Sequence, residues 1–97
     1  MILSFRDTGT EDLFNGKPSK AARKVLPTTL WHVARRRLEQ LDSAGALGDL
    51  RVPPGNRLES LSGDRKGQQS IRINDQYRIC FTWTENGQTG AEATDYH

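Results

Sequence analysis

The stretch Gln69–Trp83 constrains the fold more strongly than any other part of the chain. It contains two runs rich in β-branched and aromatic residues, Gln69–Ile73 and Tyr77–Trp83, on either side of Asn74-Asp75-Gln76. Such runs around a three-residue loop predict a β-hairpin, because Asn and Asp tolerate the left-handed backbone that these loops require.

The register of this hairpin predicts two faces of opposite character. If Ile73 pairs with Tyr77, then Arg72 lies directly opposite Arg78. Side chains alternate along a strand, so the odd-numbered positions form an apolar face: Ile71, Ile73, Tyr77, Ile79, Phe81 and Trp83. The even-numbered positions form a polar face, which we expect to be open: Ser70, Arg72, Arg78, Cys80 and Thr82.

Two arginines placed side by side repel each other by about 0.2–1 kcal/mol. A pair kept in spite of that repulsion suggests an anionic ligand, and the alternative is a pair of solvated arginines on an outer sheet face.

The rest of the chain predicts helices first and strands afterwards. A short helix from about Thr10 to Gly16 precedes a polar loop or frayed helix at Lys17–Arg23. Pro27 opens the main helix, which carries an apolar stripe and stops near Gly45.

Further strands are expected at Ile2–Phe5, Arg57–Leu61 and Ala91–His97, with an extended connector at Gly48–Asn56. The order predicts a single domain over residues 1–97 with an α+β fold. In it, two N-terminal helices pack on a twisted, mostly antiparallel sheet of about four to five strands.

Positive charge is concentrated in the N-terminal half. The net charge is only +2, yet seven of the fourteen basic residues lie in Leu13–Leu38, where there is no acidic residue. We name these residues the basic block: Lys17, Lys20, Arg23, Lys24, Arg35, Arg36 and Arg37. Such a block suits a nucleic acid or an acidic protein, and the alternative is a solvated helix face.

Several function classes are disfavoured. The only cysteine, Cys80, excludes an intrachain disulfide, and two histidines far apart give no metal-ligand spacing. No nucleotide-binding glycine loop or Gly-x-Ser-x-Gly elbow is present, so neither a cofactor nor a metal is expected. No apolar run or signal peptide indicates a membrane or export, so we expect a cytoplasmic protein.

The remaining chemistry lies in cations near a terminal Tyr96-His97 pair. The cations are Arg57, Arg65, Lys66, Arg72 and Arg78. Arginine matches phosphate oxygens, and histidine suits proton transfer near neutrality. Together they could cleave RNA without a metal: a base activates the 2′-OH, arginines stabilise the phosphorane, and an acid protonates the 5′-oxygen.

The stretch Arg57–Trp83 and the closing Asp95-Tyr96-His97 resemble the HigB-type (plasmid maintenance killer) toxins of the RelE/ParE superfamily. The run Ser-Ile-Arg-Ile-Asn-Asp-Gln-Tyr-Arg-Ile-Cys-Phe at Ser70–Phe81 is the most specific part. The resemblance implies a RelE-like fold and a bacterial type II toxin that causes growth arrest by cutting mRNA in the ribosomal (30S) A site. It also implies a HigA-like helix-turn-helix antitoxin, with operator DNA bound only through the toxin–antitoxin complex.

By position, the resemblance makes Arg72, Arg78, Tyr96 and His97 the catalytic residues. The arginines would stabilise transition-state charge, His97 would act as acid or base, and Tyr96 would stack on a base or orient a neighbour. A second set would contact RNA or the ribosome: Arg57, Arg65, Lys66, Lys17, Lys20, Arg23, Lys24, Arg35 and Arg36.

Two other functions stay open at the level of the sequence. One is a non-catalytic, ParE-like inhibitor of gyrase or another essential protein, because this superfamily uses one fold for different activities. The other is a small RNA-binding module without catalysis, which would bind RNA in a salt-dependent way.

Overall fold

The predicted hairpin forms the centre of the sheet. The computed structural model describes residues 1–96, and in it β2 (Gln69–Arg72) and β3 (Tyr77–Thr84) run antiparallel. Arg72 lies opposite Arg78, so the predicted register is confirmed. Asn74 closes the loop, because its side-chain oxygen accepts hydrogen bonds from backbone N–H groups two and three residues ahead, at 2.9 and 2.7 Å.

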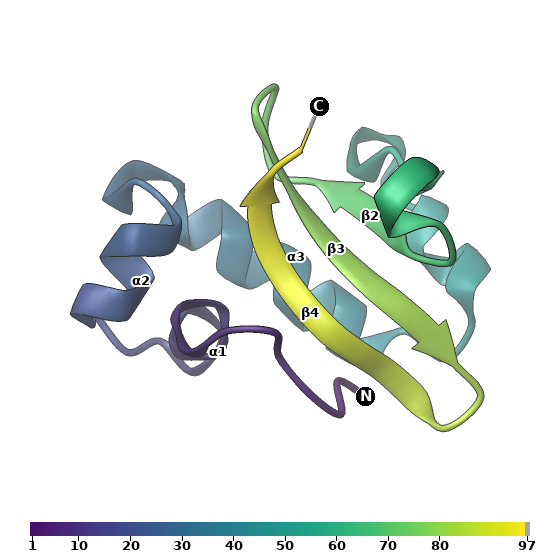
Figure 1. Ribbon diagram of the computed structural model, residues 1–97, viewed down its shortest axis with the longest axis horizontal. Coiled ribbons are helices and arrows are strands. Elements are labelled where there is room, and N and C mark those ends of the chain that lie inside the picture. Colours follow the sequence, from purple (N-terminus) through teal and green to yellow (C-terminus); the bar gives the residue numbers. More distant parts are fainter. Residues whose placement is uncertain (97) are drawn as a thin grey trace.

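Two further strands complete a four-stranded antiparallel sheet in the order β1-β2-β3-β4 (Figure 1). β4 (Gly87–Asp95) pairs with β3, and β1 (Glu59–Ser60) pairs with β2. β1 is shorter than the expected strand Arg57–Leu61, because Arg57 has a φ of +45°, in the left-handed region. The α+β fold class is confirmed.

The segment Ile2–Phe5 runs beside the outer edge of β4 (Figure 1). Two isolated parallel bridges join Ile2 to Gln88 and Phe5 to Ala91, so the expected strand is reduced to these contacts. The segment nevertheless covers an edge that would otherwise expose unpaired backbone groups.

A register shift interrupts the pairing of β3 with β4. The shift lies between Cys80 and Thr82 of β3, opposite the part of β4 where Gly90 has a φ of +62°. Glycine adopts this left-handed conformation readily, and bulges of this kind change the alternation of side chains. As a result Gln88 and Ala91, on either side of Gly90, are both buried.

Within residues 1–96 three α-helices form, where two were expected. α1 (Thr8–Asn15) and α3 (Trp31–Ser43) correspond to the expected pair. α2 (Lys20–Val25) lies partly where a loop or frayed helix was expected. Ser19 begins α2, since its hydroxyl accepts a hydrogen bond from a backbone N–H of the first turn at 3.0 Å.

The core lies between the apolar face of the sheet and α3, which crosses behind the sheet in Figure 1. Its central side chains come from α3 and from both strands of the hairpin: Ala34, Leu38, Leu41, Ile71, Ile79 and Phe81. Among residues 1–96 no helix has the length and apolarity needed to cross a membrane.

The sequence predicted an extended connector at Gly48–Asn56, and this prediction is wrong. The connector contains two 3₁₀ turns, Leu47–Arg51 and Pro54–Asn56. The fully buried Asn56 holds them together, because its amide nitrogen donates to the carbonyl oxygens of Leu50 and Val52 at 3.2 and 3.4 Å. The pattern of prolines and glycines in the sequence does not indicate these side-chain hydrogen bonds.

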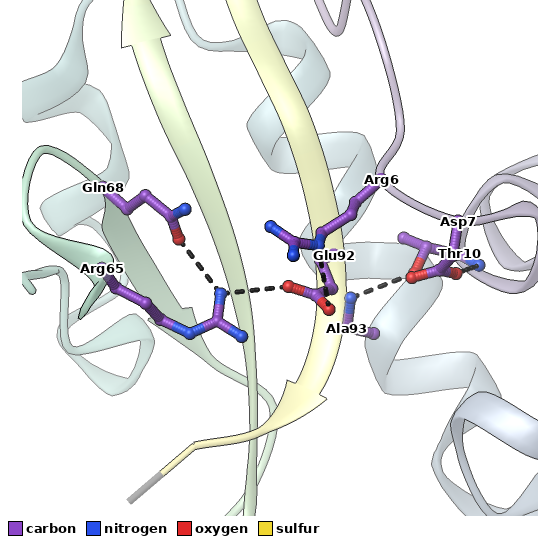
Figure 2. A network of polar contacts seen from close by, with 7 residues as sticks. All are labelled: Arg6, Asp7, Thr10, Arg65, Gln68, Glu92 and Ala93. Carbon is purple, nitrogen blue, oxygen red and sulfur yellow. Dashed lines mark hydrogen bonds and ion pairs between the residues drawn. The ribbon is translucent and has the colours of Figure 1, made fainter.

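The polar face of the sheet is not open along its whole length, which corrects a second expectation. Ser70 and Cys80 are 0% and 1% exposed. A 3₁₀ turn, η4 (Gly63–Arg65), lies on this side, and Arg65 reaches Glu92 of β4 beside Cys80 (Figure 2).

Candidate functional site

An open cleft of about 270 Å³ lies at the hairpin end of the polar face, and we call it the arginine cleft. Its lining residues come from β1 and the chain just before it, from the hairpin and from the chain after β4: Arg57, Glu59, Arg72, Asn74, Asp75, Arg78 and Tyr96. The fold therefore brings together four residues of the predicted site, namely Arg57, Arg72, Arg78 and Tyr96.

Arg78 is the most firmly held cation of the arginine cleft. Its side chain is only 11% exposed, and its Nε donates to the Ser70 hydroxyl at 2.6 Å. Its Nη2 donates to the backbone oxygen of Arg57 and lies 3.9 Å from a carboxylate oxygen of Glu59. These contacts fix the guanidinium in one orientation, which is what preorganised charge stabilisation requires.

Arg72 lies beside it and is held more loosely. Its Nη2 forms an ion pair with Asp75, whose side chain is 97% exposed in the hairpin loop. An exposed ion pair of this kind is weak, so an incoming anion can replace Asp75 on Arg72.

Helix α3 extends the positive charge beyond the cleft. Arg37 Nε donates to the backbone oxygen of Arg72 at 3.0 Å. Burial lowers the pKa of Arg37, and the neighbouring charges of Arg36 and Arg72 lower it further. Like charges are therefore grouped at the arginine cleft, on Arg36, Arg37 and Arg72.

Glu59 is a site residue that the sequence analysis missed. The predicted strand Arg57–Leu61 contains Glu59, but the sequence analysis gave this residue no role in the site. In the structure Glu59 pairs with Ser70 across β1 and β2, and it lines the arginine cleft on the same face as Arg78. If the expected strand Arg57–Leu61 had been paired with the hairpin, the sequence would have placed Glu59 on the same face of the sheet as Arg78.

Tyr96 and Arg65 lie together. Tyr96 lines the arginine cleft, and the Arg65 guanidinium lies over its ring, 5.8 Å from the centroid. Arg65 does not line the cleft, because it is bound to Gln68 and Glu92 at 3.1 and 3.0 Å (Figure 2). Burial lowers the pKa of Arg65, but the hydrogen bond with Glu92 and the negative groups nearby leave it raised.

The other predicted RNA-binding residues are exposed and lie outside the cleft lining: Lys17, Lys20, Arg23, Lys24, Arg35, Arg36 and Lys66. The predicted catalytic residue His97 lies outside the described residues. Within residues 1–96, no group of His, Cys, Asp and Glu side chains could hold a metal ion. Cys80 is buried, and burial raises the pKa of its thiol despite the charge of nearby Arg65.

Comparison with known proteins places this chain in a family. A family model described as "RelE-like toxin of type II toxin-antitoxin system HigB" matches residues 3–97. The chain belongs to the HigB-like toxin family. An antitoxin protein is therefore the class of partner that this HigB-like toxin has.

Two relatives support the same assignment. The HigB-like toxin is 41% identical over 85 residues to Toxin HigB-1 of Vibrio cholerae serotype O1, covering 88% of this chain and 86% of that protein. It is 30% identical over 97 residues to Endoribonuclease HigB of Proteus vulgaris, covering all of both chains.

A solved structure confirms the RelE-like fold of this HigB-like toxin. A chain of the YoeB-YefM complex from Staphylococcus aureus superposes with a TM-score of 0.59, covering 100% of this chain and 98% of that one. The sequence identity is 18%, so this likeness concerns the fold alone.

Proposed function

We propose that this HigB-like toxin is an endoribonuclease that cleaves mRNA in the ribosomal A site at the arginine cleft. The observation that carries the proposal is the juxtaposition of Arg72 and Arg78 in a cleft that also contains the carboxylate of Glu59. Two adjacent cations and a proton acceptor are the groups that RNA cleavage through the 2′-OH needs. Similarity to Endoribonuclease HigB over the full length of both chains supports the same activity.

The reaction begins when a base accepts the proton of the ribose 2′-OH. The 2′-oxygen then bonds to phosphorus, and the bond from phosphorus to the 5′-oxygen breaks as that oxygen receives a proton. Negative charge builds on the non-bridging oxygens in between, where Arg72 and Arg78 stabilise it. The products are a 2′,3′-cyclic phosphate and a 5′-hydroxyl, and DNA, which lacks the 2′-OH, is not cut.

Glu59 is our candidate for the base. It lines the cleft, and its carboxylate lies close to Arg78, where the transferring phosphate would sit. His97 remains our candidate for the acid, or for the base in place of Glu59. Tyr96 contributes a ring that can stack on an RNA base next to the scissile bond.

The basic block and Lys66 are proposed to bind phosphates of ribosomal RNA or an acidic surface of the antitoxin. Six of the seven residues in the block are exposed, and Arg37 is half-buried. Helix α3 carries part of this charge up to the arginine cleft through Arg36 and Arg37. A HigA-like helix-turn-helix protein is the proposed antitoxin, and operator DNA would be bound only by the complex of the two proteins.

The test uses purified toxin and ribosomes programmed with mRNA that carries either ribose or 2′-deoxyribose at the A-site codon. We expect cleavage only of the ribose substrate, and Glu59→Gln should slow it by about 10²–10⁴-fold. Glu85→Gln is the matched control, because Glu85 is an exposed carboxylate in the turn between β3 and β4. Equal cleavage of the deoxyribose substrate, or no cleavage at all, would overturn the proposal.

A further inference from the structure

Tyr96 lines the arginine cleft although it lies beyond the last strand. β4 ends at Asp95, so the sheet ladder does not fix the following residue. Within residues 1–96, the Tyr96 side chain makes no hydrogen bond, and the Arg65 guanidinium lies over its ring, 5.8 Å from the centroid. A guanidinium within about 6 Å of a ring centroid is attracted to the face of that ring.

Arg65 is itself held in place by two acceptors. Its Nη1 donates to Glu92 at 3.0 Å and to Gln68 at 3.1 Å (Figure 2). The Arg65 and Glu92 side chains are 24% and 17% exposed, so water screens their attraction less than it would at the surface. A planar guanidinium bound in this way also has a fixed plane, which a flexible lysine would not have.

Glu92 connects this arrangement to the sheet. It lies within β4, opposite Cys80 of β3, so its backbone is fixed by the ladder. Its second carboxylate oxygen lies 3.7 Å from Arg6 of the N-terminal segment. The next residue, Ala93, donates its backbone N–H to the buried hydroxyl of Thr10 in α1 at 3.1 Å, so the strand is held on this side as well (Figure 2).

We infer that the Arg65–Glu92 pair is a positioning device that sets the Tyr96 ring at the wall of the arginine cleft. Arg65 lies outside the cleft lining, and Glu92 already balances its charge, so it is a poor phosphate ligand. The consequence for RNA cleavage rests on the proposed function, whereas the placement of Tyr96 does not.

The test of the placement is ¹⁹F NMR of the toxin labelled with 3-fluorotyrosine. The chain has two tyrosines, so Tyr77 supplies an internal reference, and Tyr96→Phe assigns the signals. In Glu92→Gln and Arg65→Gln we expect the Tyr96 signal to move toward its position in the unfolded protein, with Tyr77 unchanged. Arg6→Gln, which removes the other partner of Glu92, should leave both signals in place.

Two further measurements keep this test decisive. If a substitution prevents folding, the ¹⁹F spectrum of Arg65→Lys is measured instead, and the same movement of the Tyr96 signal is expected, because a lysine keeps the charge but lacks the fixed plane of the guanidinium. A Tyr96 signal that stays in place in every variant, while the thermal midpoint falls, would show that the pair only fastens η4 to the sheet. That result would overturn the inference.

The catalytic consequence has its own readout. With ribosome-bound mRNA, Glu92→Gln should lower kcat about tenfold and leave KM within about twofold, because a misplaced group affects the transition state more than binding. An unchanged kcat together with a displaced Tyr96 signal would overturn the catalytic part alone. If the wild-type toxin cleaves no RNA, the proposed function fails and the ¹⁹F result still decides the placement.

Discussion

At the scale of single residues, the arginine cleft holds each of its two central cations in a different way. Arg78 is nearly buried and makes bonds that an anion need not displace, including the one to Ser70. Arg72 is tied to an exposed acidic residue of the hairpin loop, Asp75. We therefore expect Arg78 to act as a fixed part of the site and Arg72 to change partner when a phosphate enters.

This difference predicts the effect of removing the loop carboxylate. Asp75→Asn should strengthen binding of a short RNA by about two- to fivefold, because it frees Arg72 and removes a negative charge from the cleft. Fluorescence anisotropy with a labelled oligonucleotide measures the change. Asp64→Asn is the control, since Asp64 is exposed in η4 outside the cleft lining; equal gains in both variants would mean that only net charge matters.

At the scale of secondary-structure elements, local signals in the sequence were sufficient to predict the hairpin. They were not sufficient to predict which residues cover its polar face. The register follows from a loop closed by its own Asn74, and that information is local. The burial of Cys80 depends on Arg65 reaching a carboxylate 27 residues away, and no local pattern contains this interaction. Glu59 was missed for the same reason, because its role depends on how β1 pairs with β2.

Helices α1 and α2 provide a second case. They approach so closely at Gly9 that an added Cβ would lie 2.2 Å from the Val25 side chain and 2.5 Å from the backbone oxygen of Ala21. The polar stretch Lys17–Arg23, which overlaps α2, predicted only a loop or a frayed helix, because much of the stability of α2 comes from this packing with α1.

The close approach predicts a stability effect. Gly9→Ala should lower the free energy of unfolding by about 1–3 kcal/mol, because the nearby backbone leaves no room for a methyl group. Urea denaturation followed by circular dichroism measures it. Gly48→Ala is the control, since a Cβ there meets nothing within 4 Å; equal stability of Gly9→Ala and wild type would contradict the packing described.

At the scale of the whole molecule, the chain separates two positively charged regions. α1 lies beside β4, and α2 packs on α1 (Figure 1). The arginine cleft is lined by residues of the hairpin, by Arg57 and Glu59, and by Tyr96. α3 passes behind the sheet, and its Arg37 donates to the backbone oxygen of Arg72, a residue that lines the cleft. This arrangement suits a protein that docks with one surface and acts with another.

Because the two charged regions are separate, we expect that partner binding can be weakened without changing the arginine cleft. Reversing the charge of Lys20 and Lys24, both exposed in α2, should weaken binding to ribosomes or to the antitoxin without changing the RNA affinity of the cleft. The salt dependence of the weakened complex should also become shallower, by about one unit of slope for each phosphate that the variant no longer neutralises. Unchanged affinity for both partners would mean that these lysines are only solvated.

The central claim is that the arginine cleft cuts mRNA on the ribosome, and transcriptome-wide mapping of new mRNA 5′ ends after a brief pulse of expression tests it most directly. Wild type, Arg78→Ala and the control Arg51→Ala would be compared, Arg51 being an exposed arginine outside the cleft lining. We predict new ends in frame within translated regions for wild type and Arg51→Ala, and none for a folded Arg78→Ala protein. Growth arrest without new ends, or the same ends in Arg78→Ala, would contradict the account.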